Sequence, residues 1–353
     1  MKTAVLMSGG VDSSVALMRL IDRGRSDLTA YYLKIWLEDE LAFMGRCPWE
    51  EDLALVRAIC EREGVPLEVV SLQHAYHHRV VAYTLSELRA GRTPSPDVLC
   101  NRLIKFGAFM EAMPEDVERV ASGHYAQVLR SVAGGPHLVR GNDPVKDQTY
   151  FLCRMSTEQI RRAEFPIGEL PKTEVRRLAQ HYDLPNAARP DSQGICFLGR
   201  IPYDDFVWHH LGDEPGPIIE AESGRELGRH RGLWFHTIGQ RRGLGLAGGP
   251  WYVGGKRQDD RAVLVTHADR LPEHRRRRVV ATVMNWIGEP PAGNRFAIRL
   301  RHGERLCPAT VEGVGHDRVT ITLDEGDPGV AAGQFAVVYD GERCLGGGPV
   351  ADA

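Results

Sequence analysis

A run of small polar residues interrupts an apolar segment near the start of the chain. Thr3–Met7 is mostly apolar, Ser8–Gly10 follows it at once, and Asp12 precedes a second apolar segment with helical periodicity, Ser13–Arg23. The pattern predicts a strand, a glycine-rich turn and a helix. The first N–H groups of a helix lack intrahelical partners and carry partial positive charge, so this turn can bind an anion. Neither the Gly-Lys-Ser/Thr of a Walker loop nor the three-glycine dinucleotide spacing is present.

The first half of the chain alternates between strand-like and helix-like segments. Short apolar runs are separated by segments of helical periodicity, several of which end at a glycine. Strands separated by helices of this length predict a parallel sheet with helices on both faces. The expected strands are Thr3–Met7, Leu28–Trp36, Leu67–Leu72 and Val117–Ala121, and the expected helices are Ser13–Arg23, Glu51–Glu63, His77–Ala90 and Asn101–Met113.

The second half has a different character. Glycines and prolines cluster between Gly212 and Gly255, with little helical periodicity. From Val279 onward, short β-branched segments alternate with turn residues, which predicts a small antiparallel barrel or sandwich. The arginine run 275–278 lies near the start of this part. We therefore expect three domains, covering residues 1–205, 206–272 and 273–353.

Length and composition limit the class of protein. The 353 residues are 42% hydrophobic and 26% charged, which suits two or three globular domains. No apolar run approaches the ~18 residues of a membrane helix, and the first run is interrupted too early for a secretory signal. Seven cysteines without framework spacing favour a reducing cytoplasm over a disulfide scaffold. Because Cys-x-x-Cys and His-Glu-x-x-His spacings are absent, we expect no structural metal bound by the protein's own side chains.

The net charge of −3 conceals an asymmetry along the chain. Leu37–Glu63 has eight acids and three bases, whereas Arg225–Arg261 and Glu273–Arg305 each have eight bases and three acids. Single charged runs are usually solvated surfaces. Here two basic runs lie in the same half and are interleaved with aromatic residues, which favours binding to a polyanion such as nucleic acid.

Two cysteines lie in polar loops. In GRTPSPDVLCNRLIKFG (Gly91–Gly107), two prolines hold the chain extended before Asp97 and Cys100, at an expected helix start. A helix N-terminus lowers the pKa of a thiol, so Cys100 is a candidate reactive thiolate. Cys196 lies in a second loop, RPDSQGICFLG (Arg189–Gly199). The other cysteines fit the apolar or strand patterns of buried residues, except Cys47, which is undecided; they are Cys60, Cys153, Cys307 and Cys344.

The motif SGGVDSS (Ser8–Ser14) resembles the PP-loop of ATP pyrophosphatases, which cleave ATP between the α- and β-phosphates and transfer AMP to an oxygen. Within that superfamily, both cysteine loops resemble those of the tRNA-specific 2-thiouridylases (the MnmA/TrmU family), and the resemblance extends over essentially the whole chain. The further matching motifs are SGHYA at Ser122–Ala126, KDQTYFL at Lys146–Leu152, HTIGQRRGLG at His236–Gly245, PWYVGGK at Pro250–Lys256 and GQFAVVYDGERCLGGG around Gln334.

The resemblance implies an α/β fold: a PP-loop (adenine nucleotide alpha hydrolase-like) parallel-sheet domain, a small central domain and a C-terminal β-barrel. It also implies ATP-dependent 2-thiolation of the wobble uridine of tRNA. AMP is attached to the uridine 2-carbonyl oxygen, because that oxygen is otherwise a very poor leaving group, and sulfur from a cysteine persulfide then attacks C2. AMP and pyrophosphate are released. By the family pattern, Cys196 carries the sulfur, Cys100 resolves the intermediate, and Asp97 is the base or base-positioning group.

The resemblance also implies the binding residues and partners. The cofactors are ATP and Mg²⁺, and the partners are the anticodon region of tRNA and a persulfide-carrying sulfur donor protein or cysteine desulfurase. The uridine must be unstacked into the pocket. ATP would contact Leu6, Met7, Ser8, Gly9, Gly10, Val11, Asp12, Ser13, Leu33 and Gly123; the target base would contact Ser95, Pro96 and Asp97; and tRNA would contact His124, Lys146, Asp147, Gln148, Arg301, His302 and Gln334.

Some residues depart from the family pattern, and other functions are possible. Ser95 stands in the target-base loop where the family usually has Asn, and Leu33 stands where a Met often lines the adenine pocket. Residues 187–189 are Ala-Ala-Arg, where lysines are common before the second cysteine motif. We expect these departures to change the affinity for ligands and not the activity. A PP-loop enzyme acting on a small molecule or a different tRNA base would leave the paired cysteine loops unused. A non-catalytic RNA-binding protein would use only the basic half. Lys2 excludes an amidotransferase with an N-terminal cysteine nucleophile.

Overall fold

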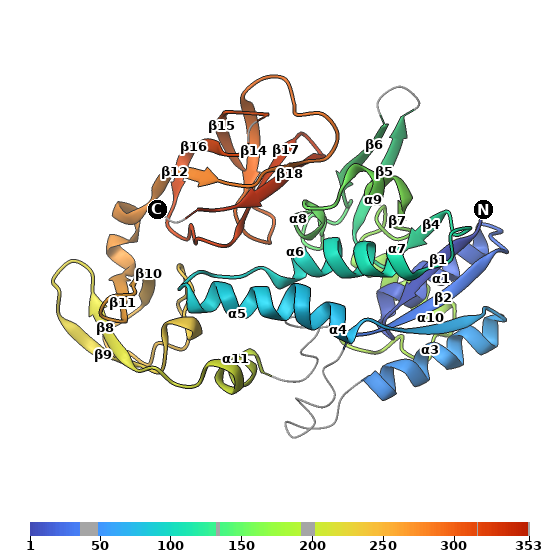
Figure 1. The fold of residues 1–353 in the computed structure, drawn as a ribbon, viewed down its shortest axis with the longest axis horizontal. Coiled ribbons are helices and arrows are strands. Elements are labelled where there is room, and N and C mark those ends of the chain that lie inside the picture. Colours follow the sequence, from blue (N-terminus) through green and yellow to red (C-terminus); the bar gives the residue numbers. More distant parts are fainter. Residues whose placement is uncertain (36–48, 132–134, 192–201, 316, 352–353) are drawn as a thin grey trace.

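A five-stranded parallel sheet forms the centre of the N-terminal domain, on the right in Figure 1. The computed structural model describes residues 1–35, 49–131, 135–191, 202–315 and 317–351. The strand order is β3-β2-β1-β4-β7, and every neighbouring pair is parallel. The strands are β1 (Thr3–Met7), β2 (Leu28–Lys34), β3 (Leu67–Ser71), β4 (Arg119–Ala121) and β7 (Ala163–Glu164).

Helices pack on both faces of this sheet, because successive residues of a strand point to opposite sides. In β1, Ala4 and Leu6 belong to one apolar core, and Val5 and Met7 to the other. The predicted parallel sheet with two covered faces is therefore confirmed. The helical elements of this domain are α1 (Val11–Asp22), α3 (Trp49–Glu63), α4 (Gln73–Tyr76), η2 (His77–Val81), α5 (Ala82–Arg89), α6 (Pro96–Cys100), η3 (Asn101–Ala108), α7 (Phe109–Ala112), α8 (Thr149–Leu152), α9 (Thr157–Arg162) and α10 (Lys172–His181).

The central domain contains a four-stranded sheet, on the left in Figure 1. Its order is β10-β11-β8-β9, and its small core contains Val253, Val263 and Val265. The elements are α11 (Tyr203–Leu211), β8 (Gly216–Glu220), β9 (Glu226–His230), η4 (Leu233–Phe235), β10 (Trp251–Arg257), β11 (Ala262–His267) and η5 (Ala268–His274). None of the helices in the described part of the chain is long and apolar enough to cross a membrane.

The C-terminal domain is a β-barrel, as the family resemblance predicted. Its strands pair antiparallel in the order β12-β16-β15-β14-β17-β18, and the short β13 also pairs with β18. The strands are β12 (Arg276–Ala281), β13 (Asn285–Trp286), β14 (Arg295–Arg299), β15 (Cys307–Glu312), β16 (Val319–Asp327), β17 (Phe335–Asp340) and β18 (Arg343–Pro349).

A hairpin of the N-terminal domain extends the sheet of the barrel. The hairpin consists of β5 (Ala126–Ser131) and β6 (Gly135–Arg140), and β6 pairs antiparallel with β18. The sequence patterns did not predict this hairpin or β18, whose three consecutive glycines (346–348) are untypical of strands. The barrel and the N-terminal domain thus share hydrogen-bonded backbone. The boundaries at residues 205 and 272 remain a proposal.

Candidate active site

The PP-loop lies where β1 ends and α1 begins. Gly9 has φ +74°, and a Cβ at this position would lie 2.9 Å from backbone atoms of Asp52 in α3, so glycine is required on both counts. The N-cap of α1 is Gly10, which makes no side-chain capping hydrogen bond. The hydroxyls of Ser13 and Ser14 instead donate to the Gly10 carbonyl, at 3.0 and 3.1 Å. An uncapped helix N-terminus after a tight glycine turn can bind phosphate.

Asp12 is held in the first turn of α1 by two donors from distant parts of the chain. Its Oδ1 accepts hydrogen bonds from the Tyr125 hydroxyl at 2.8 Å and from Lys172 Nζ at 2.6 Å. Burial and the adjacent Asp12 charge raise the pKa of Tyr125, so its phenol stays protonated and donates. The carboxylate therefore has a fixed position beside the glycine turn.

Lys172 also connects the PP-loop to the start of the second cysteine motif. Its Nζ lies 2.8 Å from Oδ1 of Asp191, and Lys146 Nζ lies 2.7 Å from Oδ2 of the same carboxylate. Arg176 pairs with Asp191 as well. Burial raises the pKa of Asp191, but the hydrogen bonds from Lys146 and Lys172 outweigh burial and hold the pKa below its ordinary value. A chain of alternating charges thus runs from Asp12 to Lys146.

The segment that precedes the second cysteine motif packs directly on the PP-loop. Asn186 is buried, and its Nδ2 donates to the Gly9 carbonyl at 2.8 Å and to Ser14 Oγ at 2.9 Å. Arg189 donates to the same carbonyl at 3.2 Å and pairs with Asp52 at 2.6 Å. The structure therefore brings the two motifs together at this point. Cys196 itself, like Cys47, lies outside the described residues.

The other predicted ATP residues lie at the carboxyl edge of the same sheet, where ligands of open α/β sheets bind. A Cβ at Gly123 would lie 2.7 Å from backbone atoms of Asp12 and Ser13, so a glycine is needed where the segment after β4 meets α1. Leu33 is a half-buried residue of the neighbouring strand β2. Leu6 and Met7 are buried in the two cores of the sheet.

Asp97 and Cys100 lie on α6, which begins earlier than the sequence predicted. Pro96 is in the first turn, a position that suits proline because its missing N–H has no partner there. Asp97 is in the first turn too, but Cys100 is the fifth residue and 1% exposed, within the apolar core. The helix-terminus effect falls off within the first turn. The predicted activation of Cys100 by the helix N-terminus is therefore weaker than the sequence indicated.

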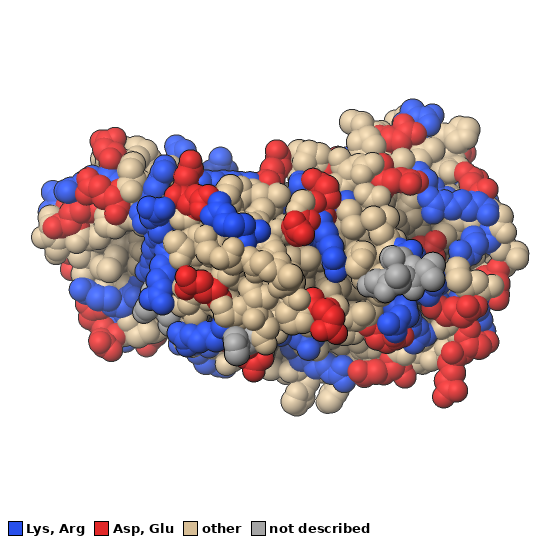
Figure 2. Space-filling model, turned by 90° about the horizontal axis from the view of Figure 1, so that it is seen from above, with Lys and Arg blue, Asp and Glu red and all other residues tan. Residues whose placement is uncertain are grey.

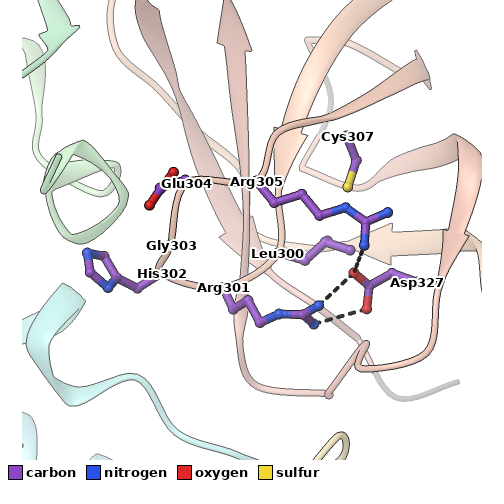
Figure 3. Close-up of a pocket in the computed structure, with 8 residues that line it drawn as sticks. All are labelled: Leu300, Arg301, His302, Gly303, Glu304, Arg305, Cys307 and Asp327. Atoms are coloured by element: carbon purple, nitrogen blue, oxygen red, sulfur yellow. Dashed lines mark hydrogen bonds and ion pairs between the residues drawn. The ribbon is translucent and has the colours of Figure 1, made fainter. Parts of the chain in front are cut away.

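The barrel contributes residues close to Asp97. His302 stacks on Phe151 of α8, with 4.7 Å between ring centroids. Burial and Arg299 lower the pKa of His302, while the charges of Asp147 and Asp97 oppose this shift. Arg301 makes two hydrogen bonds of 2.9 Å to Asp327, and Arg305 approaches the same carboxylate (Figure 3). The loop that carries Arg301 and His302 is thus held on one side by Asp327 and on the other by the stacking of His302 on Phe151.

Three of the residues predicted to contact tRNA have hydrogen-bond or ion-pair partners within the protein, and two of them, His124 and Asp147, are buried. His124 is 8% exposed, lies against Phe106 and Phe165, and hydrogen-bonds Ser122 at 2.8 Å. Gln148 accepts a hydrogen bond from the Tyr125 backbone at 3.0 Å. Asp147 is 1% exposed and pairs with Arg299 at 2.7 Å. Arg301 and His302 are exposed and Lys146 is half-buried, so their side chains are more accessible to RNA. The roles of all these residues in tRNA binding remain predictions.

Sequence reasoning missed four residues that shape this site: Tyr125, Lys172, Asn186 and Asp191. Tyr125 and Asp191 lie inside quoted motifs, but no spacing rule links either of them to Asp12. Lys172 and Asn186 lie outside every motif that the sequence analysis used. The buried cysteines were predicted correctly: Cys60, Cys153, Cys307 and Cys344 are buried. In the described residues, no group of three or more His, Cys, Asp or Glu is arranged to hold a metal ion.

Three family models match consecutive parts of the chain. They are described as a tRNA methyl transferase HUP domain (residues 1–200), a tRNA methyl transferase PRC-barrel domain (204–267) and an aminomethyltransferase beta-barrel domain (276–350). The chain is 42% identical to a tRNA-specific 2-thiouridylase MnmA of Parabacteroides distasonis over 360 residues, covering 100% of this chain and 99% of the relative. Similar proteins of Porphyromonas gingivalis and Bacteroides fragilis, with the same description, are also 42% identical over at least 99% of both chains.

Proposed function

The chain belongs to the tRNA-specific 2-thiouridylase family, and from this we infer that it is an enzyme that uses ATP to replace the 2-oxygen of the wobble uridine of tRNA with sulfur. One observation supports this function most directly. Asn186, which lies just before the second cysteine motif, and Arg189 and Asp191 at its start are bonded to the PP-loop or to residues that hold it. A nucleotide site and a sulfur-carrying segment must meet for such chemistry.

We propose that activation precedes sulfur transfer. The PP-loop binds the phosphates of ATP against the N-terminus of α1, where unpaired N–H groups stabilise negative charge. Transfer of AMP to the uridine 2-oxygen releases pyrophosphate and leaves an ester of AMP on C2. The sulfur nucleophile then attacks C2, and AMP leaves with the oxygen.

The protein residues have separate proposed roles. Cys196 carries the sulfur as a persulfide, and the outer sulfur of that persulfide bonds to C2 as AMP leaves. Cys100 then attacks Sγ of Cys196, which forms a Cys100–Cys196 disulfide and leaves the outer sulfur on C2; if the same attack occurs beforehand, it releases sulfide, which attacks C2 instead. In both cases a thiol reductant reduces the disulfide before the next turnover. Asp97 orients the base or takes its proton, because it lies in the first turn of α6 beside the predicted base loop. The burial of Cys100 among apolar residues raises the energy of its thiolate, so we expect it to react only with substrate bound.

Mg²⁺ is proposed to enter with ATP. Asp12 beside the loop accepts hydrogen bonds from Lys172 and Tyr125, and Asp52 pairs with Arg189. The described residues therefore offer no pair of unpartnered carboxylates there, and phosphate oxygens and water would supply most of the ligands of the ion. This suits Mg²⁺, since it keeps several waters and seldom needs a cage of protein carboxylates.

The basic face of the barrel is proposed to bind the tRNA backbone near the anticodon. Arg275–Arg278 are exposed, and Figure 2 shows a band of basic side chains on the side of the molecule where β12 lies. The sulfur is proposed to come from a persulfide-carrying donor protein or a cysteine desulfurase. Because its substrate is tRNA, we propose that the enzyme works in the cytoplasm.

The test is a reaction with transcribed tRNA, ATP, Mg²⁺, a cysteine desulfurase with L-cysteine as the persulfide source, and a thiol reductant, followed by mass spectrometry of the nucleosides. We expect 2-thiouridine at the wobble position, and none when the wobble uridine is replaced by cytidine. Pyrophosphate release with a small molecule and no tRNA would instead favour a small-molecule ligase. Thiolation of the cytidine-substituted tRNA would indicate a different target base.

A further inference from the structure

The loop before α6 is held from two sides by different domains. It spans residues 91–95 and leads into α6, which carries Asp97, and in Figure 1 it runs from the end of α5 nearest the central domain back to α6, below the barrel. Lys256 of the central domain donates to the Gly91 carbonyl at 3.2 Å. From the barrel side, the Ala332 carbonyl accepts from the Thr93 N–H at 2.8 Å, and Gln334 donates to the Pro94 carbonyl at 3.5 Å.

On the central-domain side, Gly91 packs closely against Lys256 and Gln258. Gly91 has φ +73°, and a Cβ at this position would lie 1.9 Å from Nε2 of Gln258, so the loop approaches the sheet closely. Lys256 is half-buried, and burial lowers its pKa to about 8. His230 and His236 lie nearby, and burial lowers the pKa of each, so both are neutral near pH 7. Lys256 is thus the cationic group of this cluster.

The contact on the barrel side is equally close. Gly333 has φ +86°, and a Cβ there would lie 2.7 Å from the Thr93 carbonyl oxygen. The next strand, β17, is tied to the N-terminal domain through Tyr150, whose hydroxyl donates to the Phe335 carbonyl at 3.3 Å and accepts from the Phe335 N–H at 3.2 Å. The Tyr150 hydroxyl also interacts with Ser95. The loop end nearest Asp97 is therefore fixed by the barrel.

We propose that Lys256 is a positioning residue for thiolation: through Gly91, the central domain sets the position of the loop that presents Ser95, Pro96 and Asp97 to the uridine. This inference rests on the proposed function. It assigns a task to the PWYVGGK motif, which the proposed chemistry does not otherwise use. Residues 91–93 of the loop are half-buried and belong to no helix or strand, so we expect the position of the loop to depend on the hydrogen bonds at its two ends.

The expected effect is on the chemical step and not on RNA affinity. Lys256 bonds the protein backbone and is half-buried, so removal of its ammonium removes no contact that the exposed basic faces offer to phosphate. A displacement of about 1 Å in a reacting group lowers rates by up to about 100-fold. We therefore expect Lys256→Met to lower the single-turnover rate of thiolation at least about tenfold while the Kd for tRNA changes less than about twofold.

The experiment compares four variants with the wild type in single-turnover thiolation and tRNA binding. Lys256→Arg retains a charged donor and is expected to recover most of the rate lost in Lys256→Met. Arg257→Met is the matched control, because Arg257 is the next residue of β10, is exposed, and pairs with Asp260 three residues away. Gln258→Ala disturbs the same contact without altering a buried cation. Hydrogen exchange of residues 91–97 is measured on each protein.

The outcomes separate this inference from the proposed function. Support would be slow thiolation with unchanged tRNA affinity in Lys256→Met, together with faster hydrogen exchange of the loop. In Arg257→Met, the loop exchange and the thiolation rate at saturating tRNA should be those of the wild type. If Lys256→Met thiolates at the wild-type rate, or loses tRNA affinity in parallel with rate, the inference is wrong. If Lys256→Met does not fold, a wild-type rate in Gln258→Ala together with unchanged loop exchange would overturn it. Absence of thiolation in the wild type would contradict the proposed function itself.

Discussion

Asp147 and Arg299 form an ion pair of 2.7 Å between Oδ2 and Nη1, with side chains 0% and 1% exposed. The pair joins the turn before α8 to strand β14 of the barrel. Thr149 donates to Asp147 at 2.9 Å and hydrogen-bonds the Tyr339 hydroxyl at 3.1 Å, and the Arg299 guanidinium lies 5.0 Å from the Tyr339 ring centroid. This buried cluster fixes the barrel against the N-terminal domain.

Removal of one partner of this pair should destabilise the protein strongly. Arg299→Met leaves the Asp147 carboxylate buried without its main partner, which costs about 3–5 kcal/mol of unfolding free energy in comparable cases. Asp147→Asn combined with Arg299→Met removes both charges of the pair, while Arg140, which also lies 3.4 Å from Asp147, keeps Glu342 as a partner, so the double variant should recover part of that loss. Urea unfolding measures both. A loss below about 1 kcal/mol in the single variant would show that the pair is not desolvated as the structure indicates.

Substitutions in the PP-loop should impair the reaction of ATP and leave RNA binding intact. Asp12→Ala removes the carboxylate that Lys172 and Tyr125 orient, so we expect pyrophosphate release to be abolished and tRNA binding to be nearly unchanged. Gly9→Val should have the same effect on release, with an added cost from φ +74° and the contact with Asp52. Asp22→Ala, at the far end of α1, is the control. Normal pyrophosphate release by Asp12→Ala would refute the assignment of this loop.

Charge reversal on β12 should weaken tRNA binding. Arg276 and Arg278 are exposed, and each contact with a phosphate releases counterions. With glutamate at both positions, the plot of log K for tRNA binding against log salt concentration should become less steep, its negative slope decreasing in magnitude by about 1.5. The control pair is Arg161→Glu with Arg177→Glu, two exposed arginines that each pair with a glutamate three residues away. Equal salt slopes for wild type and the β12 variant would show that tRNA binds elsewhere.

Serine variants of the two loop cysteines, Cys100 and Cys196, should stop the reaction at different steps. Cys196→Ser is expected to eliminate thiolation while the uridine is still adenylated, because the ATP site is intact. Cys100→Ser should stop turnover later, with persulfide still able to form on Cys196. Alanine at the buried Cys60 or Cys307 should leave activity largely unchanged. Mass spectrometry of the persulfide adduct decides between these roles: sulfur carried by a cysteine other than Cys196, or thiolation by Cys196→Ser, contradicts them.

The stability contributed at Lys256 should depend on pH in a defined direction. Burial lowers its pKa to about 8 from 10.5 in a free lysine, so between these values the unfolded chain binds the extra proton. The stability of the wild type relative to Lys256→Met should therefore rise from pH 8 to pH 10.5 and be constant below pH 8. The facing groups are the Gly91 carbonyl, Gln258, His230 and His236, and the two histidines stay neutral over this range. Thermal unfolding at pH 7, 9 and 10.5 measures the difference.

The sequence predicted the parts of the structure that depend on local patterns. β1 has the predicted bounds, and α1 follows the glycine turn, because apolar periodicity and glycine placement act over a few residues. The β5–β6 hairpin was missed, since its outer partner β18 is rich in glycine and far away in the sequence. Lys172 and Asn186 were missed for a related reason: their partners Asp12 and Gly9 are more than 150 residues distant.

The β6–β18 pairing has a consequence for synthesis on the ribosome. β18 begins about 200 residues after β6 ends, which at 5–20 residues per second is a delay of roughly 10–40 s. During this time the outer edge of β6 lacks its native neighbour, and an unpaired edge can template pairing with another chain. The nascent N-terminal domain can complete its parallel sheet early, but its hairpin stays open to wrong partners until the last barrel strand has been translated.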